Sequence, residues 1–226
     1  METLPFYLSL VFGLTVLSTV FGFYVAAGKS KPFLLIAFGF IAFQSALGLS
    51  GFYQITNSTP PRFPLLIIPT IFAIFILFFT IKGRTFLDVL DLKGLTLLHL
   101  IRIPVEVVLF SLFLHKAIPE IMTFEGRNPD ILSGITAPVV YFLGFRNKKI
   151  YKPILLIWNF LTLGLLFNIV FHAILSAPSV FQQFGFDQPN IAIFYFPFVL
   201  LPSVVVPLVL LSHLATIWKL LKVRVG

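Results

Sequence analysis

The sequence predicts an all-α protein whose helices cross a membrane seven times. Hydrophobic residues make up 58% of the 226 residues, charged residues only 11%, and the mean hydropathy is +1.03. A soluble domain does not reach these values because it needs a charged surface, so several segments are expected to lie in lipid. Each apolar run is about 20 residues long, the length at which a helix spans the ~30 Å hydrocarbon core. The chain length predicts a single transmembrane domain, residues 1–226.

The first three spans follow one another closely. Residues 4–27 are almost free of charge and end at a Gly-Lys-Ser-Lys run. Pro32 then opens the second span, residues 32–53, because a proline in the first helical turn lacks only an N–H that has no partner there. A polar loop leads to the third span, residues 63–81. The short polar segment 85–93 predicts an interfacial helical turn.

The last four spans have recognisable starts and contrasting contents. The fourth, residues 95–114, is apolar at both ends but carries charges near its centre. The fifth, residues 128–145, begins with Asn128 as N-cap followed by Pro and Asp, a well-formed helix start. The sixth and seventh, residues 154–176 and 191–218, are long, and the seventh contains three prolines.

The basic residues separate onto the two sides of this seven-span arrangement. One side has 12 of them and the other has 3, so the positive-inside rule places the N-terminus outside and the C-terminus in the cytoplasm. This topology explains the +8 net charge without a nucleic-acid partner. The cytoplasmic set is Lys29, Lys31, Lys82, Arg84, Lys93, Arg146, Lys148, Lys149, Lys152, Lys219, Lys222 and Arg224, and the outer set is Arg62, Lys116 and Arg127.

Several kinds of chemistry are not indicated by the sequence. Without cysteine there is no disulfide, no thiolate nucleophile and no cysteine-based metal site. No Ser-His-Asp order, HExxH motif or phosphate-binding glycine loop is present, and the seventh span has no interior lysine for a Schiff base. We therefore expect no metal and no other cofactor. The first apolar run lacks a basic leader, so no cleavable signal peptide is expected.

Two short patterns recur in the same order and on the same side of the membrane. A Lys-Pro-x-Leu-Leu-Ile pattern precedes the second and sixth spans, and a Phe-Pro-x-x-x-x-Pro pattern lies in the third and seventh. They favour a 3+1+3 arrangement of two parallel repeats, residues 1–84 and 128–226, linked by the span 93–116. Chance is the alternative, because Leu, Ile and Pro are common here. The arrangement is similar to that of a small sugar-transporter family, but the Pro-Gln signature of that family is absent.

The fourth span holds the main candidate site. His99, Arg102 and Glu106 lie within about 60° of one another on a helix, so they share one stripe. Arg102 and Glu106 are four residues apart and are expected to pair, which offsets much of the cost of burying either charge. The functional interpretation is a substrate-binding or proton-handling pair that lines a central polar cavity. The alternative is a purely structural ion pair.

Polar residues of neighbouring spans are expected at a similar depth. Counting ~1.5 Å per residue from the cytoplasmic lysines places Gln44 and Asn168 near Glu106, around one cavity. His172 continues the polar stripe of Asn168 one turn outward. His99 and His213 lie at matching depths, but two histidines without an acidic ligand make a poor metal or haem site.

The outer loop before the fifth span is the candidate catalytic region. Glu120, Glu125, Arg127 and Asp130 occur within eleven positions. Three acids and one base suit general acid–base catalysis at the lipid surface, or a cation site. The alternative is a capping cluster at the start of the fifth span.

At His-Leu-Ile-Arg-Ile-Pro-Val-Glu (residues 99–106) and Met-Thr-Phe-Glu-Gly-Arg-Asn (residues 122–128), the chain resembles an uncharacterised family of bacterial multi-pass membrane proteins. The resemblance implies an integral protein of the bacterial inner membrane and attaches no activity.

Three functions remain open from the sequence. The first is a small transporter, or a membrane protein that binds a solute or lipid ligand. The second is an intramembrane enzyme that acts on a lipid-borne substrate through the outer loop. The third is a structural or accessory subunit. The sequence leaves the substrate and the oligomeric state open.

Overall fold

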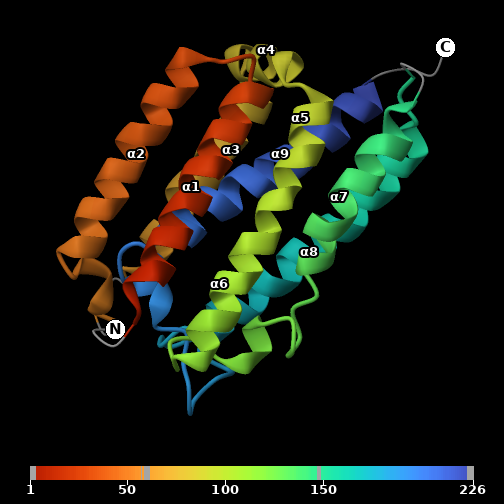
Figure 1. The fold of residues 1–226 in the computed structure, drawn as a ribbon. Helices are drawn as coiled ribbons and strands as arrows, with labels where there is room; N and C mark the ends of the chain where they lie inside the picture. Colours follow the sequence, from red (N-terminus) through yellow and green to blue (C-terminus); the bar gives the residue numbers. More distant parts are fainter. Residues whose placement is uncertain (1–3, 57, 59–61, 147–148, 223–226) are drawn as a thin grey trace.

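The computed structural model describes residues 4–56, 58, 62–146 and 149–222, and this part of the chain is helical with no strand. Figure 1 shows the arrangement. The principal helices are α1 (Phe6–Ala26), α2 (Lys31–Leu49), α3 (Ile68–Phe79), α4 (Ile81–Val89), α5 (Leu92–Leu98), α6 (Arg102–Leu114), α7 (Ile131–Gly144), α8 (Lys152–Ser176) and α9 (Val206–Lys222). Short turns of other helix types are η1 (Phe52–Gln54), η2 (Phe63–Leu66), η3 (His99–Ile101), η4 (Glu120–Met122), η6 (Ala192–Phe194) and η7 (Leu201–Val205).

Five helical segments of the described chain are long and apolar enough to cross a membrane, which indicates an integral membrane protein. They are α1, α2, the run from α5 to α6, α8, and the run from η7 to α9. The pair α3 and α4 qualifies only when taken together, and the chain bends by 91° between them. The apolar helix α7 has 14 residues and is shorter than each of these five segments. The count of seven spans therefore stays a prediction.

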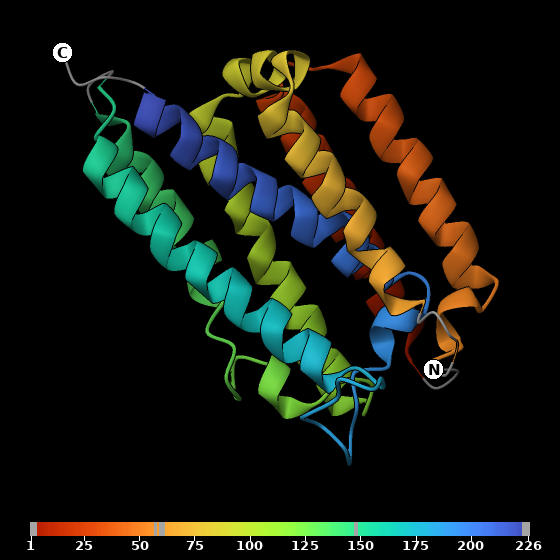
Figure 2. The ribbon, with the colours of Figure 1, turned by 180° about the vertical axis from the view of Figure 1, so that it is seen from behind.

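The run from α5 to α6 lies at the centre of the bundle. It contacts α1 on one side and α7 on the other, while α9 crosses behind it and packs against α8 and α5 (Figures 1 and 2). The helix α4 lies across one end of the bundle, beside the C-terminal end of α1 (Figure 1). This position agrees with the interfacial helical turn expected there, although the helix begins a few residues earlier, at Ile81.

Two irregular turns interrupt the long helices at prolines. The central span changes to a 3-10 turn at η3, because Pro104 has no N–H to donate to the carbonyl of Leu100. The last span opens with the π-helical turn η7, which contains Pro202 and precedes Pro207. Both breaks leave backbone carbonyls without their usual helical donors.

The start of α7 differs from the sequence prediction. The helix begins at Ile131, and Asn128 is not its N-cap. The Oδ1 atom of Asn128 instead accepts the backbone N–H of Asp130 at 3.2 Å, two residues on. This local turn delays the helix and directs the side chains of Asn128 and Asp130 into the protein.

The two predicted repeats agree in some features and differ in others. Helices α2 and α8 both begin at the lysine of the recurring Lys-Pro pattern, Lys31 and Lys152. However, only 11% of the apolar window of α2 is buried within the protein, against 39% for α8. The two helices therefore start alike but pack differently, and the internal repeat stays a prediction.

Candidate functional site

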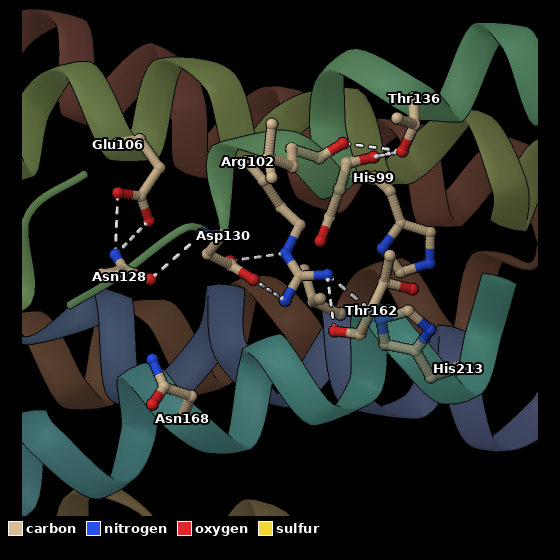
Figure 3. Close-up of polar contacts among 12 residues, drawn as sticks. His99, Arg102, Glu106, Asn128, Asp130, Thr136, Thr162, Asn168 and His213 are labelled. Carbon is tan, nitrogen blue, oxygen red and sulfur yellow. Dashed lines mark hydrogen bonds and ion pairs between the residues drawn. The ribbon is translucent and has the colours of Figure 1, made fainter.

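Nine polar residues gather inside the bundle where η3, α6, α7, α8 and α9 meet (Figure 3). None is more than 4% exposed, so their polar atoms depend on one another for hydrogen bonds. We call this group the buried polar cluster. It consists of His99, Arg102, Glu106, Asn128, Asp130, Asn159, Thr162, Ser212 and His213.

Arg102 pairs with Asp130, and the predicted pair with Glu106 is wrong. The Nε atom of Arg102 donates to Oδ2 of Asp130 at 2.6 Å, and its Nη2 atom lies 2.5 Å from Oδ1. Two parallel contacts of this kind give a strong and directional ion pair. Because Arg102 is the first residue of α6 and Asp130 lies just before α7, the pair ties the start of α6 to the start of α7. The other ion pair among the described residues, Lys222 with Asp88, is exposed.

The remaining guanidinium nitrogen of Arg102 reaches α8 and α9. Nη1 donates to the carbonyl of Thr162 and to Nε2 of His213, both at 3.2 Å. Since arginine only donates, Nε2 of His213 is the accepting nitrogen and Nδ1 carries the hydrogen. That Nδ1 lies 2.9 Å from Oδ1 of Asn159, whose amide nitrogen donates to the carbonyl of Leu155 at 2.8 Å. The network therefore assigns one neutral tautomer to His213.

Glu106 is held by an amide. The side-chain nitrogen of Asn128 lies 2.7 and 2.8 Å from the two carboxyl oxygens of Glu106 and 3.0 Å from the carbonyl of Met122. Through the Asn128 contact to the backbone of Asp130, the chain of hydrogen bonds continues from Glu106 to Arg102 and His213. No ion pair of Glu106 with a cation is found in the described part of the chain.

His99 stacks on His213 at the end of the cluster away from Glu106 (Figure 3). The ring centroids are 4.0 Å apart, with an angle of 29° between the planes. The hydroxyl of Ser212 donates to the carbonyl of Val209 at 2.7 Å, so Nε2 of His99, 3.1 Å from that hydroxyl, acts as the donor. The Nδ1 atom of His99 is then a buried acceptor without a partner among the described residues. The part of the chain that the structure describes contains no group of three or more His, Cys, Asp or Glu residues that could hold a metal ion.

Three predicted residues lie outside the cluster. Gln44 is buried on α2, where it accepts from the hydroxyl of Tyr53 at 2.6 Å and donates to the carbonyl of Leu65 at 3.4 Å. On α8, Asn168 donates to the carbonyl of Arg127 at 2.7 Å and has no dashed contact to the cluster in Figure 3. His172 lies 2.9 Å from the carbonyl of Asn168. No hydrogen bond joins Gln44 or Asn168 to Glu106 in the described part of the chain. Asn168 instead reaches the backbone of Arg127, next to the Asn128 that binds Glu106.

The predicted acid–base set of the outer loop is divided between surface and interior. Glu120, Glu125 and Arg127 are exposed, whereas Asp130 is buried against Arg102. The turn at Asn128 produces this division, since it points the carboxylate of Asp130 inward.

Five members of the cluster were not among the predicted site residues. Asn128 was expected only as a helix N-cap and His213 only as half of a poor metal pair, and the other three were not singled out. Asn159 and Ser212 are polar residues inside apolar spans, a signal that was available in the sequence. Thr162 accepts from Arg102 through its backbone carbonyl. Every residue has such a carbonyl, so the residue type at position 162 does not indicate this contact.

Two pockets of the described structure lie away from the cluster. One, of about 110 Å³, lies between α3, α8 and α9, and the other, of about 470 Å³, lies between α2, α3 and α9. No residue of the buried polar cluster lines either pocket. The predicted central polar cavity coincides with neither of them.

The comparison with protein families matches residues 61–221, which is more than half of the chain, to a family described as "Domain of unknown function (DUF8737)". No curated protein and no solved structure matches the chain.

Proposed function

Since the chain belongs to the DUF8737 family, we propose its function from the buried polar cluster: a small proton-coupled transporter in which Glu106 and Asp130 compete for Arg102. The observation that carries this proposal is the presence of two buried carboxyl groups and one arginine on one chain of hydrogen bonds. Ionisable residues inside a membrane span are costly and usually mark a transport or proton path.

The proposal includes a membrane arrangement. The chain crosses the inner membrane of a bacterium seven times, with the N-terminus outside, and residues 1–84 and 128–226 form two parallel repeats. The twelve-to-three distribution of basic residues supports the orientation. The equivalent starts of α2 and α8 support the repeats.

In the present arrangement Asp130 holds Arg102, and the hydrogen-bond partner of the Glu106 carboxyl group within the described residues is the amide of Asn128. A carboxylate without a cation in a low-dielectric interior costs several kcal/mol, whereas its protonated form is neutral. Glu106 is therefore the proton-binding group of the proposal. Its neighbours in the cluster are Asp130, the cation of Arg102, and the two neutral imidazoles of His99 and His213.

Loss of the Glu106 proton changes the balance at Arg102. The new carboxylate lies four residues along the same helix, within reach of the arginine. If Arg102 turns towards Glu106, Asp130 loses its partner and the start of α7 is released from α6, so that water reaches the carboxylate of Asp130 and offsets the loss of its cation. This movement opens the outer half of the bundle to a solute. Protonation of Glu106 restores the Arg102–Asp130 pair, closes the outer half and allows the cytoplasmic half to open in turn.

The enzyme hypothesis receives less support. Its acid–base residues are divided, with Asp130 buried and the other three exposed, and neither pocket contains them. In the transporter hypothesis, the buried carboxyl groups of Glu106 and Asp130 bind the proton and the Arg102 cation.

The absence of cysteine allows a direct test by single introduced thiols. Ser133→Cys places a thiol beside Asp130 near the outer half, and Ser212→Cys places one near the inner end, both at positions that are 0% exposed. A membrane-impermeant maleimide is applied to oriented vesicles from each side at acidic and at alkaline pH. The exposed Ser50→Cys variant corrects for the reactivity of the thiol itself.

The transporter is expected to show opposite accessibility at the two positions. Ser133→Cys should react from the outer side at alkaline pH, and Ser212→Cys from the cytoplasmic side at acidic pH. Glu106→Gln should abolish the pH dependence at both positions. Thiols that remain unreactive at every pH and from both sides would refute the transporter and favour a structural subunit.

A further inference from the structure

An apolar groove lies between α2, α3 and α9, away from the buried polar cluster. Figure 2 shows these three helices, with α4 across one end. The groove has a volume of about 470 Å³ and is lined by residues such as Phe33 and Ala37 of α2, Ala73 of α3, and Pro207 and Leu211 of α9. Its walls are nearly all carbon, so it suits a hydrocarbon ligand.

The dimensions of the groove match one hydrocarbon chain within one leaflet. Its lining extends from Ser30, the N-cap of α2, to Phe40 on that helix, and the ten residue steps between them correspond to about 15 Å of helix. This length is about half of the ~30 Å hydrocarbon core. A protein cavity of about 150 Å³ holds one benzene, so a volume three times as large holds roughly eighteen carbon atoms. These are the length and the carbon count of a phospholipid acyl chain.

Two exposed lysines neighbour residues that line one end of the groove, which we call its mouth. Ser30 and Pro32, at the start of α2, line that end, and the exposed Lys31 lies between them in the chain. Phe86 of α4 lines the same groove, and Lys82 precedes it by one helical turn, on the same face. Neither ion pair found among the described residues contains Lys31 or Lys82.

We propose that this groove binds one acyl chain of an anionic phospholipid, whose phosphate lies between Lys31 and Lys82 at the membrane surface. The apolar walls hold the acyl chain, and the two ammonium groups select a negative headgroup. The start of α2 adds the partial positive charge of a helix N-terminus on the same side. The lipid then fills the space beside α2, which has little contact with the rest of the protein.

The test measures lipid retained by the purified full chain in detergent. The protein is equilibrated with equal amounts of phosphatidylglycerol and phosphatidylcholine, and bound lipid is counted by native mass spectrometry. Ala37→Trp fills the groove, whereas Ala42→Trp places the same side chain on an exposed position of α2 outside it. Lys31→Gln with Lys82→Gln removes the basic mouth, and Lys149→Gln is the matched control at a distant exposed position.

The wild-type protein is expected to retain phosphatidylglycerol in preference to phosphatidylcholine. Ala37→Trp should lose the bound lipid and Ala42→Trp should keep it. Each lysine removed should reduce the preference for the anionic lipid about five-fold. Equal retention by Ala37→Trp and the wild type, or an unchanged preference in the double lysine variant, would overturn the proposal.

A second measurement needs no substitution. A phosphatidylglycerol with a photoreactive acyl chain is added to the wild-type protein, and the labelled peptides are mapped. Labels concentrated on residues 30–40, 69–77 and 203–211 support the groove. Labels spread over all lipid-facing helices show only annular lipid and refute it.

Discussion

Replacing Arg102 and Asp130 tests which carboxyl group holds the arginine. Asp130→Leu strands a buried guanidinium, and the loss of one partner of a buried pair costs ~3–5 kcal/mol of unfolding free energy. Arg102→Met strands the carboxylate and also removes the donor to the Thr162 carbonyl and to His213. Each acceptor left unsatisfied adds ~1–3 kcal/mol. Arg102→Met is therefore expected to be the more destabilising single change.

The double variant Arg102→Met with Asp130→Leu should regain most of this loss. An apolar pair of similar volume replaces the buried ion pair at little net cost, although the acceptors of Arg102 stay unsatisfied. We expect a coupling energy of at least ~2 kcal/mol between these two positions. The wild type, the two single variants and the double variant form a double-mutant cycle. Their unfolding free energies are measured in detergent micelles, with circular dichroism as the probe of helix content.

The control is the same cycle for Arg102 and Glu106, with Glu106→Leu as the second change. Because Arg102 is in contact with Asp130, coupling to Glu106 is expected to stay below ~1 kcal/mol. A larger coupling to Glu106 than to Asp130 would refute the assignment of the pair.

Three further outcomes follow from the structure. Asn159→Leu removes the acceptor of the His213 N–H and should cost ~1–3 kcal/mol in the same unfolding assay, whereas no loss would exclude that bond. Gly134→Leu should reduce the yield of folded protein, because even a Cβ at Gly134 would lie 2.7 Å from Cγ1 of Ile103; normal yield would show that α7 can move away. Reporter fusions at the C-terminus and in the loop 54–62 should report opposite compartments, and the same compartment for both would reject the seven-span topology.

Local patterns in the sequence determined much of the helical framework. The long apolar runs predicted the spans that α1, α2 and α8 form. Pro32 predicted where α2 begins, whereas the sixth span was predicted from residue 154, two residues after α8 begins at Lys152. These features depend on neighbouring residues: a run of apolar side chains needs lipid or protein around it, and a proline has no N–H wherever the chain folds. The candidate charges of the central span were visible for the same reason, since a charge in an apolar run is conspicuous.

Only the tertiary structure decided which groups these charges contact. From the sequence, Glu106 was the natural partner of Arg102, because it lies one helical turn away. In the folded chain Asp130, 28 residues distant, binds Arg102, since the turn at Asn128 points its carboxylate towards α6. The same packing separated Gln44 from the cluster and brought in Asn159. Helical periodicity fixes which face a side chain occupies, but the partner on that face depends on how the helices pack, and a single sequence does not specify that packing locally.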